Sequence, residues 1–175
     1  CALPILKRCL LNNIGHSADI SLTAELPITI YNGNTIMDFK KLASLYKDEL
    51  LDNVLPFWLE HSQDHEYGGY FTCLDREGKV FDTDKFIWLQ SREVWMFSML
   101  YNKVENRQEW LDCAIQGGEF LKKYGHDGDY NWYFSLDRSG RPLVEPYNIF
   151  SYTFATMAFG QLSLATGNQI GRAHV

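Results

Sequence analysis

The sequence predicts an all-α fold of the α/α-toroid type, represented by about two helix–hairpin–helix units with two short β-hairpins. The first observation is an internal repeat, because residues 70–78 and 133–140 are nearly the same when one residue is gapped. Their tyrosines, Tyr70 and Tyr133, stand 63 positions apart (133 − 70), and their closing glycines stand 62 apart (140 − 78). The second observation is that each copy follows an amphipathic helix and precedes a helix that is apolar on every side.

Alternating half-exposed and buried helices suit two concentric rings, in which the inner ring is buried and the outer ring is wet. Two units cannot close such a ring, since six units of about 62 residues would need roughly 370 residues on this repeat. The chain shows no third unit, and we therefore interpret it as truncated.

The composition suits a folded domain of ordinary size and excludes several classes of protein. Among the 175 residues, 46% are hydrophobic and 15% aromatic, which supports a sizeable core and excludes wholesale disorder. The net charge of −6, without a basic patch, argues against a nucleic-acid partner, and no apolar run reaches membrane-spanning length. The cysteines show no CxxC pair and no regular spacing, so we expect free thiols and a cytoplasmic location. They are Cys1, Cys9, Cys73 and Cys113.

The first 36 residues differ from the rest of the chain, and residues 12–34 show neither helical nor strand periodicity that persists. Because Met37 is the first methionine and a strong helix pattern follows it, we interpret residues 1–36 as a non-native or disordered extension. A flexible native extension is the alternative. The domain is then expected to span residues 37–168, with residues 169–175 as a tail after truncation.

In the first unit, an amphipathic helix is predicted from Asp38, which can cap the first turn. Its apolar residues recur at steps of three and four from Phe39 to Trp58, and a kink is expected at Pro56. A β-hairpin follows at residues 68–81, because an Asp-x-x-Gly turn separates two runs of aromatic and β-branched residues.

The second unit repeats this order. An amphipathic helix is predicted at about residues 108–124, followed by a hairpin at 131–143. The last helix, at about 147–165, contains no charged residue, and Gly167 is expected to end it. The inner face of the amphipathic helix is predicted to consist of Trp110, Ala114, Gly118 and Leu121.

The central helix, residues 88–101, is apolar on all sides yet carries Arg92 in its middle. A buried guanidinium keeps its proton, so something anionic or oxygen-rich must face it. Two alternatives are open: a salt bridge to a carboxylate of a neighbouring helix, or a pocket floor of aromatics around one fixed cation. Asp82 and Asp84, just before the helix, are interpreted as its N-cap and first-turn charges. At helical spacing, the residues that share the face of Arg92 are Trp88, Trp95, Met96 and Met99.

Three segments, residues 67–71, 88–97 and 132–137, carry a resemblance to a known family. The Leu-Gln-x-Arg-x-Val-Trp pattern in the second segment is the most specific of them. From Met37 to about Asn168 the chain resembles the N-acylglucosamine 2-epimerase family, which includes cellobiose 2-epimerases and related sugar isomerases. The resemblance covers about the first third of a family member, and it implies an (α/α)6 barrel with the sugar bound at one mouth.

The resemblance also implies a chemistry, the interconversion of C2 epimers of an aldose or N-acetylhexosamine. A base removes the proton beside the C1 carbonyl of the ring-opened sugar, and an acid returns a proton to the opposite face of the enediolate. In the family two histidines of later helices act as acid and base, and none of the five histidines here can be assigned to them. The family's arginine beside the carbonyl oxygen matches Arg92, which is therefore the candidate catalytic residue. Candidates for a sugar-binding aromatic platform are Tyr70, Trp88, Trp95 and Tyr133, although core packing explains Trp95 at least as well.

Other titratable residues have structural explanations, and neither a metal nor a cofactor is expected. His61 and His65 stand four apart, but the segment between them looks like a loop, so surface histidines are favoured over a metal site. Asp75 and Asp137 occupy equivalent turn positions, where turn chemistry explains them better than catalysis.

Two other functions stay open on the sequence alone. A glycoside hydrolase or lyase on the same architecture needs two carboxylates facing a cleft, and the apolar helices supply only Glu93. A helical-repeat interaction module needs an exposed binding face instead of a buried arginine among tryptophans. The expected partner is a small-molecule sugar; which sugar it is, and whether the full-length form is a homodimer, are not decided by the sequence.

Overall fold

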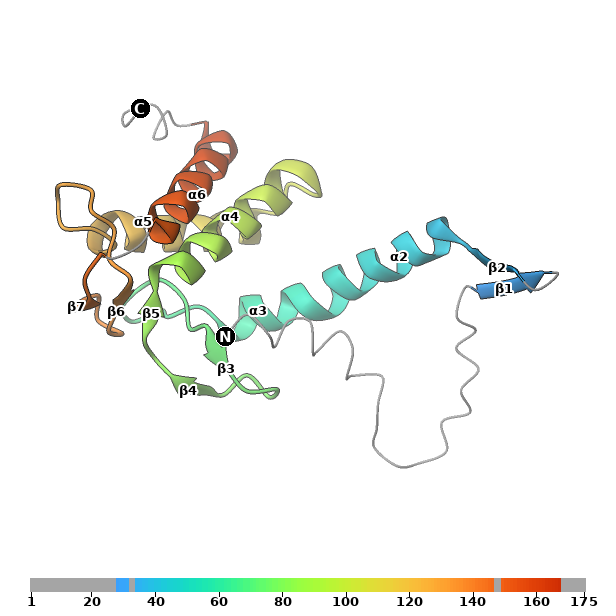
Figure 1. Cartoon of the computed structure of the whole chain (residues 1–175), viewed down its shortest axis with the longest axis horizontal. Helices are drawn as coiled ribbons and strands as arrows, with labels where there is room; N and C mark the ends of the chain where they lie inside the picture. Colours follow the sequence, from blue (N-terminus) through green and yellow to red (C-terminus); the bar gives the residue numbers. More distant parts are fainter. Residues whose placement is uncertain (1–27, 32–33, 147–148, 168–175) are drawn as a thin grey trace. The chain divides into compact units, whose positions relative to one another are not determined.

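The computed structural model of the chain describes residues 28–31, 34–146 and 149–167 (Figure 1). Contacts along the chain define two compact units, one that ends at Trp58 and one that begins at Leu59. No helix in the described ranges combines the length and the apolar character that crossing a bilayer requires.

The first compact unit contains two strands that were not predicted from the sequence. β1 (Ile28–Tyr31) and β2 (Asn34–Met37) pair antiparallel. Strands of four residues are too short to give a persistent alternation, which explains why no periodicity was found there. Most of residues 1–36, and the tail at 169–175, lie outside the described residues, so their interpretation as extension and tail stays a prediction.

The predicted first helix forms in three pieces: α2 (Phe39–Glu49), a π-helical turn η1 (Leu50–Val54) and α3 (Leu55–His61). The cap is confirmed, because Asp38 Oδ1 accepts the backbone N–H groups of Lys40 and Lys41 at 3.0 and 3.1 Å. The irregularity directly precedes Pro56. The N–H of Leu55 donates to the carbonyl of Leu50, five residues back, so the helical hydrogen bonds have already shifted where Pro56 lacks an N–H. No residue of α2 is buried, so the predicted apolar face is not covered there.

The second compact unit is organised around α4 (Ile87–Lys103), which lies beside α5 (Gln108–Tyr124) and α6 (Phe150–Thr166) (Figure 1). The bounds of α5 agree with the prediction, and all four residues of its predicted inner face are buried. α6 begins at Phe150, whereas Tyr147 and Asn148 of the predicted helix lie outside the described residues. Gly167 ends α6 in the left-handed conformation, with φ of 67°, as expected.

An inner helix is buried in a complete ring, but two repeats are expected to leave apolar residues of α6 facing water, namely Phe150, Phe154, Met157 and Phe159. This is confirmed for Phe150 and Met157, whereas Phe154 and Phe159 are half-buried. The buried residues of α6 lie on one side, and Leu164 on the remaining surface is exposed as well. The reason is that α4 and α5 cover only part of the circumference of α6 among the described residues.

Both predicted hairpins are present, as β3 (Cys73–Leu74) with β4 (Val80–Asp82) and as β6 (Ser135–Leu136) with β7 (Pro142–Val144). A further strand, β5 (Lys85–Phe86), pairs with β6 and was not predicted. The second hairpin is therefore hydrogen-bonded to the segment that leads into α4. The predicted N-cap for α4 is wrong, because the cap position is Phe86 and the Asp82 carboxylate accepts the N–H of Asp84 instead.

Hydrogen bonds fix how the two repeats align. Phe71 N donates to Ser62 O in the first copy, and Tyr133 N donates to Gly125 O in the second. Phe71, and not Tyr70, is thus the equivalent of Tyr133, 62 positions on (133 − 71). The pairing of Tyr70 with Tyr133 in the sequence was one residue off, because the gapped residue falls in the loop before the hairpin and not within it. The predicted turn roles also hold, since the carboxylates of Asp75 and Asp137 accept backbone N–H groups within their own turns.

Candidate functional site

Arg92 lies on α4 with its side chain exposed, so the prediction of a buried guanidinium is wrong for this chain. The carbon at the centre of the guanidinium is 5.8 Å from the Trp88 ring centroid and 5.7 Å from that of Phe154. These two rings, from α4 and α6, lie 6.1 Å apart. None of the ion pairs recorded among the described residues includes Arg92. Of the two alternatives, the cation on an aromatic wall fits, and its donors are open to a ligand.

Phe154 was not recognised as a site residue, although the repeat gives a signal for it. It stands 62 positions after Arg92 (154 − 92), so the two residues occupy equivalent places on consecutive apolar helices. Trp88 and Trp95 are both half-buried, and they stand four residues before and three residues after Arg92. This spacing places them on the same side of α4 as the guanidinium.

Tyr133 is half-buried and belongs to the segment that reaches the start of α4. The neighbouring carbonyl of Phe134 accepts the N–H of Ile87 at 3.0 Å, and the Phe86 and Phe134 rings meet edge to face at 5.6 Å. The second hairpin therefore holds Tyr133 at the same end of α4 that carries Trp88.

Tyr70, in contrast, is a core residue with no face of its ring open to a sugar. Its hydroxyl donates to the carbonyl of Cys113 at 2.7 Å, and burial raises the pKa of this hydroxyl far above its usual range. Its backbone N–H and carbonyl both pair with the Gln90 side chain, at 2.8 Å each. The Gln90 amide thus pairs with the backbone of Tyr70 through two hydrogen bonds, as a neighbouring strand would, and holds the Tyr70 segment against α4.

Glu93 follows Arg92 in the sequence but is not its partner. Its Oε2 is buried without a hydrogen-bond partner among the described residues, and burial raises the pKa of its carboxyl well above the usual range. Burial, and after it the Glu93 carboxyl, raise the pKa of the Cys113 thiol on α5. Glu93 therefore faces the α4–α5 contact, away from the aromatic wall around Arg92.

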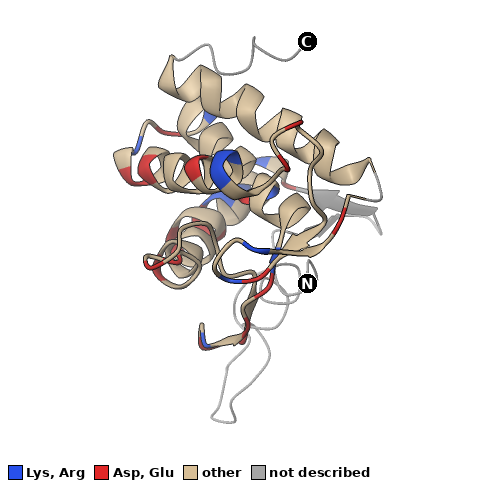
Figure 2. Ribbon diagram, turned by 90° about the vertical axis from the view of Figure 1, so that its left-hand side faces the viewer, with Lys and Arg blue, Asp and Glu red and all other residues tan. Residues whose placement is uncertain are grey.

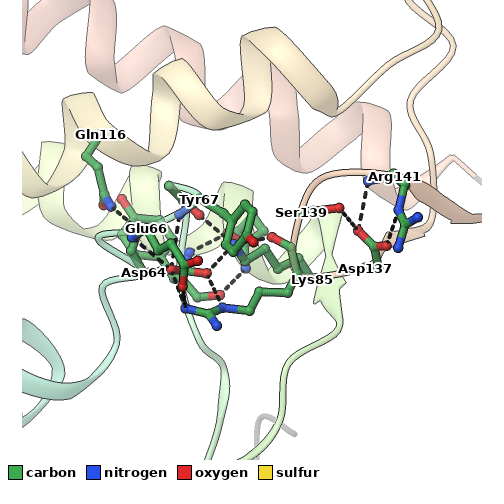
Figure 3. A network of polar contacts seen from close by, with 12 residues as sticks. Asp64, Glu66, Tyr67, Lys85, Gln116, Asp137, Ser139 and Arg141 are labelled. Carbon is green, nitrogen blue, oxygen red and sulfur yellow. Dashed lines mark hydrogen bonds and ion pairs between the residues drawn. The ribbon is translucent and has the colours of Figure 1, made fainter.

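A polar network around Asp64 was not predicted at all (Figure 3). Lys85 and Asp64 are both fully buried, and Lys85 Nζ donates to Asp64 Oδ2 at 2.9 Å. Arg138 adds two hydrogen bonds to the same carboxylate, Nε to Oδ2 at 3.0 Å and Nη2 to Oδ1 at 3.1 Å. Burial alone would raise the pKa of Asp64, but the bonds from Arg138 and Lys85 lower it to about 2. Because every charge in the network is paired, we interpret it as structural rather than catalytic.

The remaining titratable side chains form no further centre. His61 is half-buried and lies 3.7 Å from the Glu60 carboxylate, while His65 is exposed. Within the described ranges, no three His, Cys, Asp or Glu side chains gather in a way that would hold a metal ion. Cys73 and Cys113 are buried and form no disulfide among the described residues, and Cys1 and Cys9 lie outside these residues.

Charges of both signs are interspersed over the described residues (Figure 2). Across this part of the chain the view shows no broad basic stretch of the kind that binds a phosphate backbone.

Solved structures place the fold among sugar epimerases with an (α/α)6 barrel. The cellobiose 2-epimerase from Bacillus thermoamylovorans superimposes with a TM-score of 0.69 at 27% identity, over 75% of this chain and 34% of that one. A sugar epimerase from a ruminal bacterium gives a TM-score of 0.68 at 29% identity, over 74% and 33%. The predicted toroidal architecture is confirmed.

Sequence comparison identifies the family. Residues 69–175 match the model of N-acylglucosamine 2-epimerase (GlcNAc 2-epimerase), and the chain belongs to this family. It is 48% identical over 124 residues to the N-acylglucosamine 2-epimerase of Mus musculus, covering 69% of this chain and 30% of that protein. Identity to the cellobiose 2-epimerase of Bacteroides fragilis is 28% over 122 residues, or 69% and 31%. The chain thus spans about a third of the length of these relatives.

Proposed function

We propose that this chain supplies an arginine-bearing wall to the active site of a sugar 2-epimerase of the N-acylglucosamine type. The reaction takes the C2 proton from the ring-opened sugar and returns one to the opposite face. Negative charge then develops on the C1 oxygen of the enediolate. The observation that carries the proposal is Arg92, whose charge no recorded ion pair uses and whose guanidinium lies against Trp88 and Phe154.

In this proposal Arg92 donates hydrogen bonds to the C1 oxygen as it becomes an oxyanion. A fixed donor of this kind is worth about 3 kcal/mol to the transition state. Trp88, Trp95 and Tyr133 provide apolar faces for the C–H side of the sugar. The acid and base are histidines that, by family resemblance, belong to helices not matched by these residues.

The degree of identity supports an N-acylated aldohexose as the substrate. Mammalian N-acylglucosamine 2-epimerases share 47–48% identity with the chain, against 28–30% for cellobiose 2-epimerases. We also propose a cytoplasmic location, which is supported by Cys73 and Cys113, since neither forms a disulfide among the described residues. A glycoside hydrolase is not supported, since Glu93 faces α5 and not the aromatic wall.

The test is a chimera in which this chain's residues replace the matching segment of the mouse enzyme. C2 exchange from D2O is followed by NMR with N-acetylmannosamine and, separately, with cellobiose. We expect turnover of the N-acyl sugar, a loss of about 10²–10³ in kcat for Arg92→Ala, and a loss of at least about tenfold for Arg92→Lys.

Arg107→Lys is the matched control, because Arg107 also lies over an aromatic ring, that of Trp110, but is paired with Glu105. Unchanged turnover in Arg92→Lys would make the arginine structural and overturn the proposal. Exchange catalysed by the 175-residue chain alone, and lost in Arg92→Ala, would show that this chain also carries the base.

A further inference from the structure

The loop after α3 holds an arginine that comes from the next repeat. Asp64 Oδ1 and Oδ2 receive Nη2 and Nε of Arg138, and Glu66 Oε2 lies 2.9 Å from Nη2. The guanidinium also lies over the Tyr67 ring, 5.1 Å from its centroid. Arg138 directly follows the turn aspartate Asp137 of the second hairpin. The loop of the first repeat therefore binds the turn arginine of the second repeat, and we call such a loop an arginine receptor.

The second repeat contains a similar loop, in which Asp127 stands 63 positions after Asp64 (127 − 64). Asp127 Oδ1 accepts the N–H groups of Asp129 and Asn131 at 2.9 and 3.1 Å. Asp64 Oδ1 likewise accepts two N–H groups of its own loop, at 3.1 and 3.2 Å. An acid again follows two residues after the aspartate, and a tyrosine, Tyr130, follows three residues after it.

The two receptors differ in what balances their charge. Asp64 is fully buried and faces Lys85 and Arg138. Asp127 is exposed, and its Oδ2 accepts a hydrogen bond from the neutral Asn131 amide at 2.8 Å. Among the described residues, no ion pair to Asp127 or Asp129 is recorded. The positions 62 and 63 after Lys85 hold Tyr147 and Asn148, so the sequence provides no lysine there either.

We propose that the Asp127–Asn131 loop is a docking site for an arginine on the hairpin turn of a further helix–hairpin unit of the same repeat. In the first repeat the equivalent loop already binds an arginine, Arg138, and this independent observation identifies arginine as the ligand expected in the second repeat. The planar fork of arginine matches two carboxylates that a point charge would contact less well. This inference concerns assembly and does not depend on the proposed epimerase activity.

The experiment titrates the isotopically labelled 175-residue chain with a cyclised peptide that has the sequence of residues 132–143, which carries the turn arginine. We expect chemical-shift changes at the amides of Asp129 and Asn131. Alanine in place of the arginine that corresponds to Arg138 should weaken binding at least about tenfold, and lysine should weaken it less. Asp127→Asn in the chain should have an effect similar to that of the alanine peptide.

Asp129→Asn is the second variant, because the Asp129 carboxylate has no hydrogen bond to any other described residue and the loop can keep its shape. Asp112→Asn, an exposed acid on α5, removes the same charge elsewhere and should leave binding unchanged. Failure of the peptide to bind, equal affinity for the alanine peptide, or wild-type affinity in both Asp127→Asn and Asp129→Asn would overturn the proposal. Sedimentation over a dilution series excludes the other source of the arginine, a second copy of the chain. We expect a monomer throughout, and self-association that is lost in Asp127→Asn would assign the arginine to a second copy and overturn the assignment to a further unit in tandem.

Discussion

Lys85 Nζ lies 2.9 Å from Asp64 Oδ2, and neither side chain is exposed to solvent. The same ammonium also donates to the carbonyl oxygens of Gly68 at 2.6 Å and Arg138 at 2.9 Å. Its three N–H groups are therefore all used, which is the condition under which a buried cation is tolerated. Through this pair the loop after α3, the strand before α4 and the second hairpin are tied to one point (Figure 3).

Asp64→Asn should destabilise the protein by about 3–5 kcal/mol, because it leaves the Lys85 charge buried without a counterion. The measurement is urea unfolding at pH 7, followed by far-UV circular dichroism. Asp112→Asn serves as the control, since that carboxylate is exposed on α5. A change of less than about 1 kcal/mol for Asp64→Asn would mean that the network contributes no more than a surface pair.

The same network should give the protein a defined acid sensitivity. Hydrogen bonds from Arg138 and Lys85 lower the pKa of Asp64 from its ordinary value of 3.8 to about 2 in the folded state, although burial opposes them. A lowered carboxyl pKa contributes stability that is fully present above the unfolded value and is lost as the pH falls through the folded one. We expect the free energy of unfolding to fall between about pH 4 and pH 2 in the wild type. The fall should be smaller in Asp64→Asn; equal slopes would contradict this assignment.

Glu93→Gln should have the opposite pH dependence. Burial raises the Glu93 pKa, so its contribution is fully present below the unfolded value and is lost as the pH rises through the folded one. The neutral amide cannot ionise, so the variant should gain on the wild type as the pH rises above the usual carboxyl value of 4.5. Each pKa unit between the folded and the unfolded state is worth about 1.4 kcal/mol of this gain. Thermal unfolding across this pH range is the measurement, and Glu119→Gln, exposed on α5, should show no such trend.

The helices and hairpins were predictable because their signals are local. The apolar spacing of residues 108–124 gave the bounds of α5, and the Asp-x-x-Gly turns gave both hairpins. Burial was less predictable, since the exposure of Arg92 depends on which elements lie beside it.

The Asp64 network was out of reach for the same physical reason. Its bonds join residues 21 and 74 positions apart, and no periodicity of the chain records such pairs. Within the candidate site, a family motif indicated Arg92, but only the packing of α4 against α6 brought Phe154 to it.

Two glycines in helices should respond oppositely to alanine, which tests the packing of Tyr70 directly. A Cβ at Gly117 on α5 would overlap the Tyr70 ring, which is fully buried and hydrogen-bonded through its hydroxyl to Cys113 O. Gly117→Ala should therefore destabilise by about 1–3 kcal/mol, the usual effect of overpacking, despite the better helix propensity of alanine. A Cβ at Gly160 on α6 meets nothing within 4 Å, so Gly160→Ala should stabilise by about 0.4–1 kcal/mol. Urea unfolding of both variants under one set of conditions gives the comparison. If Gly117→Ala proved as stable as Gly160→Ala, the Tyr70 ring could not lie against α5. The contact between the segment before the first hairpin and α5 would then have to be abandoned.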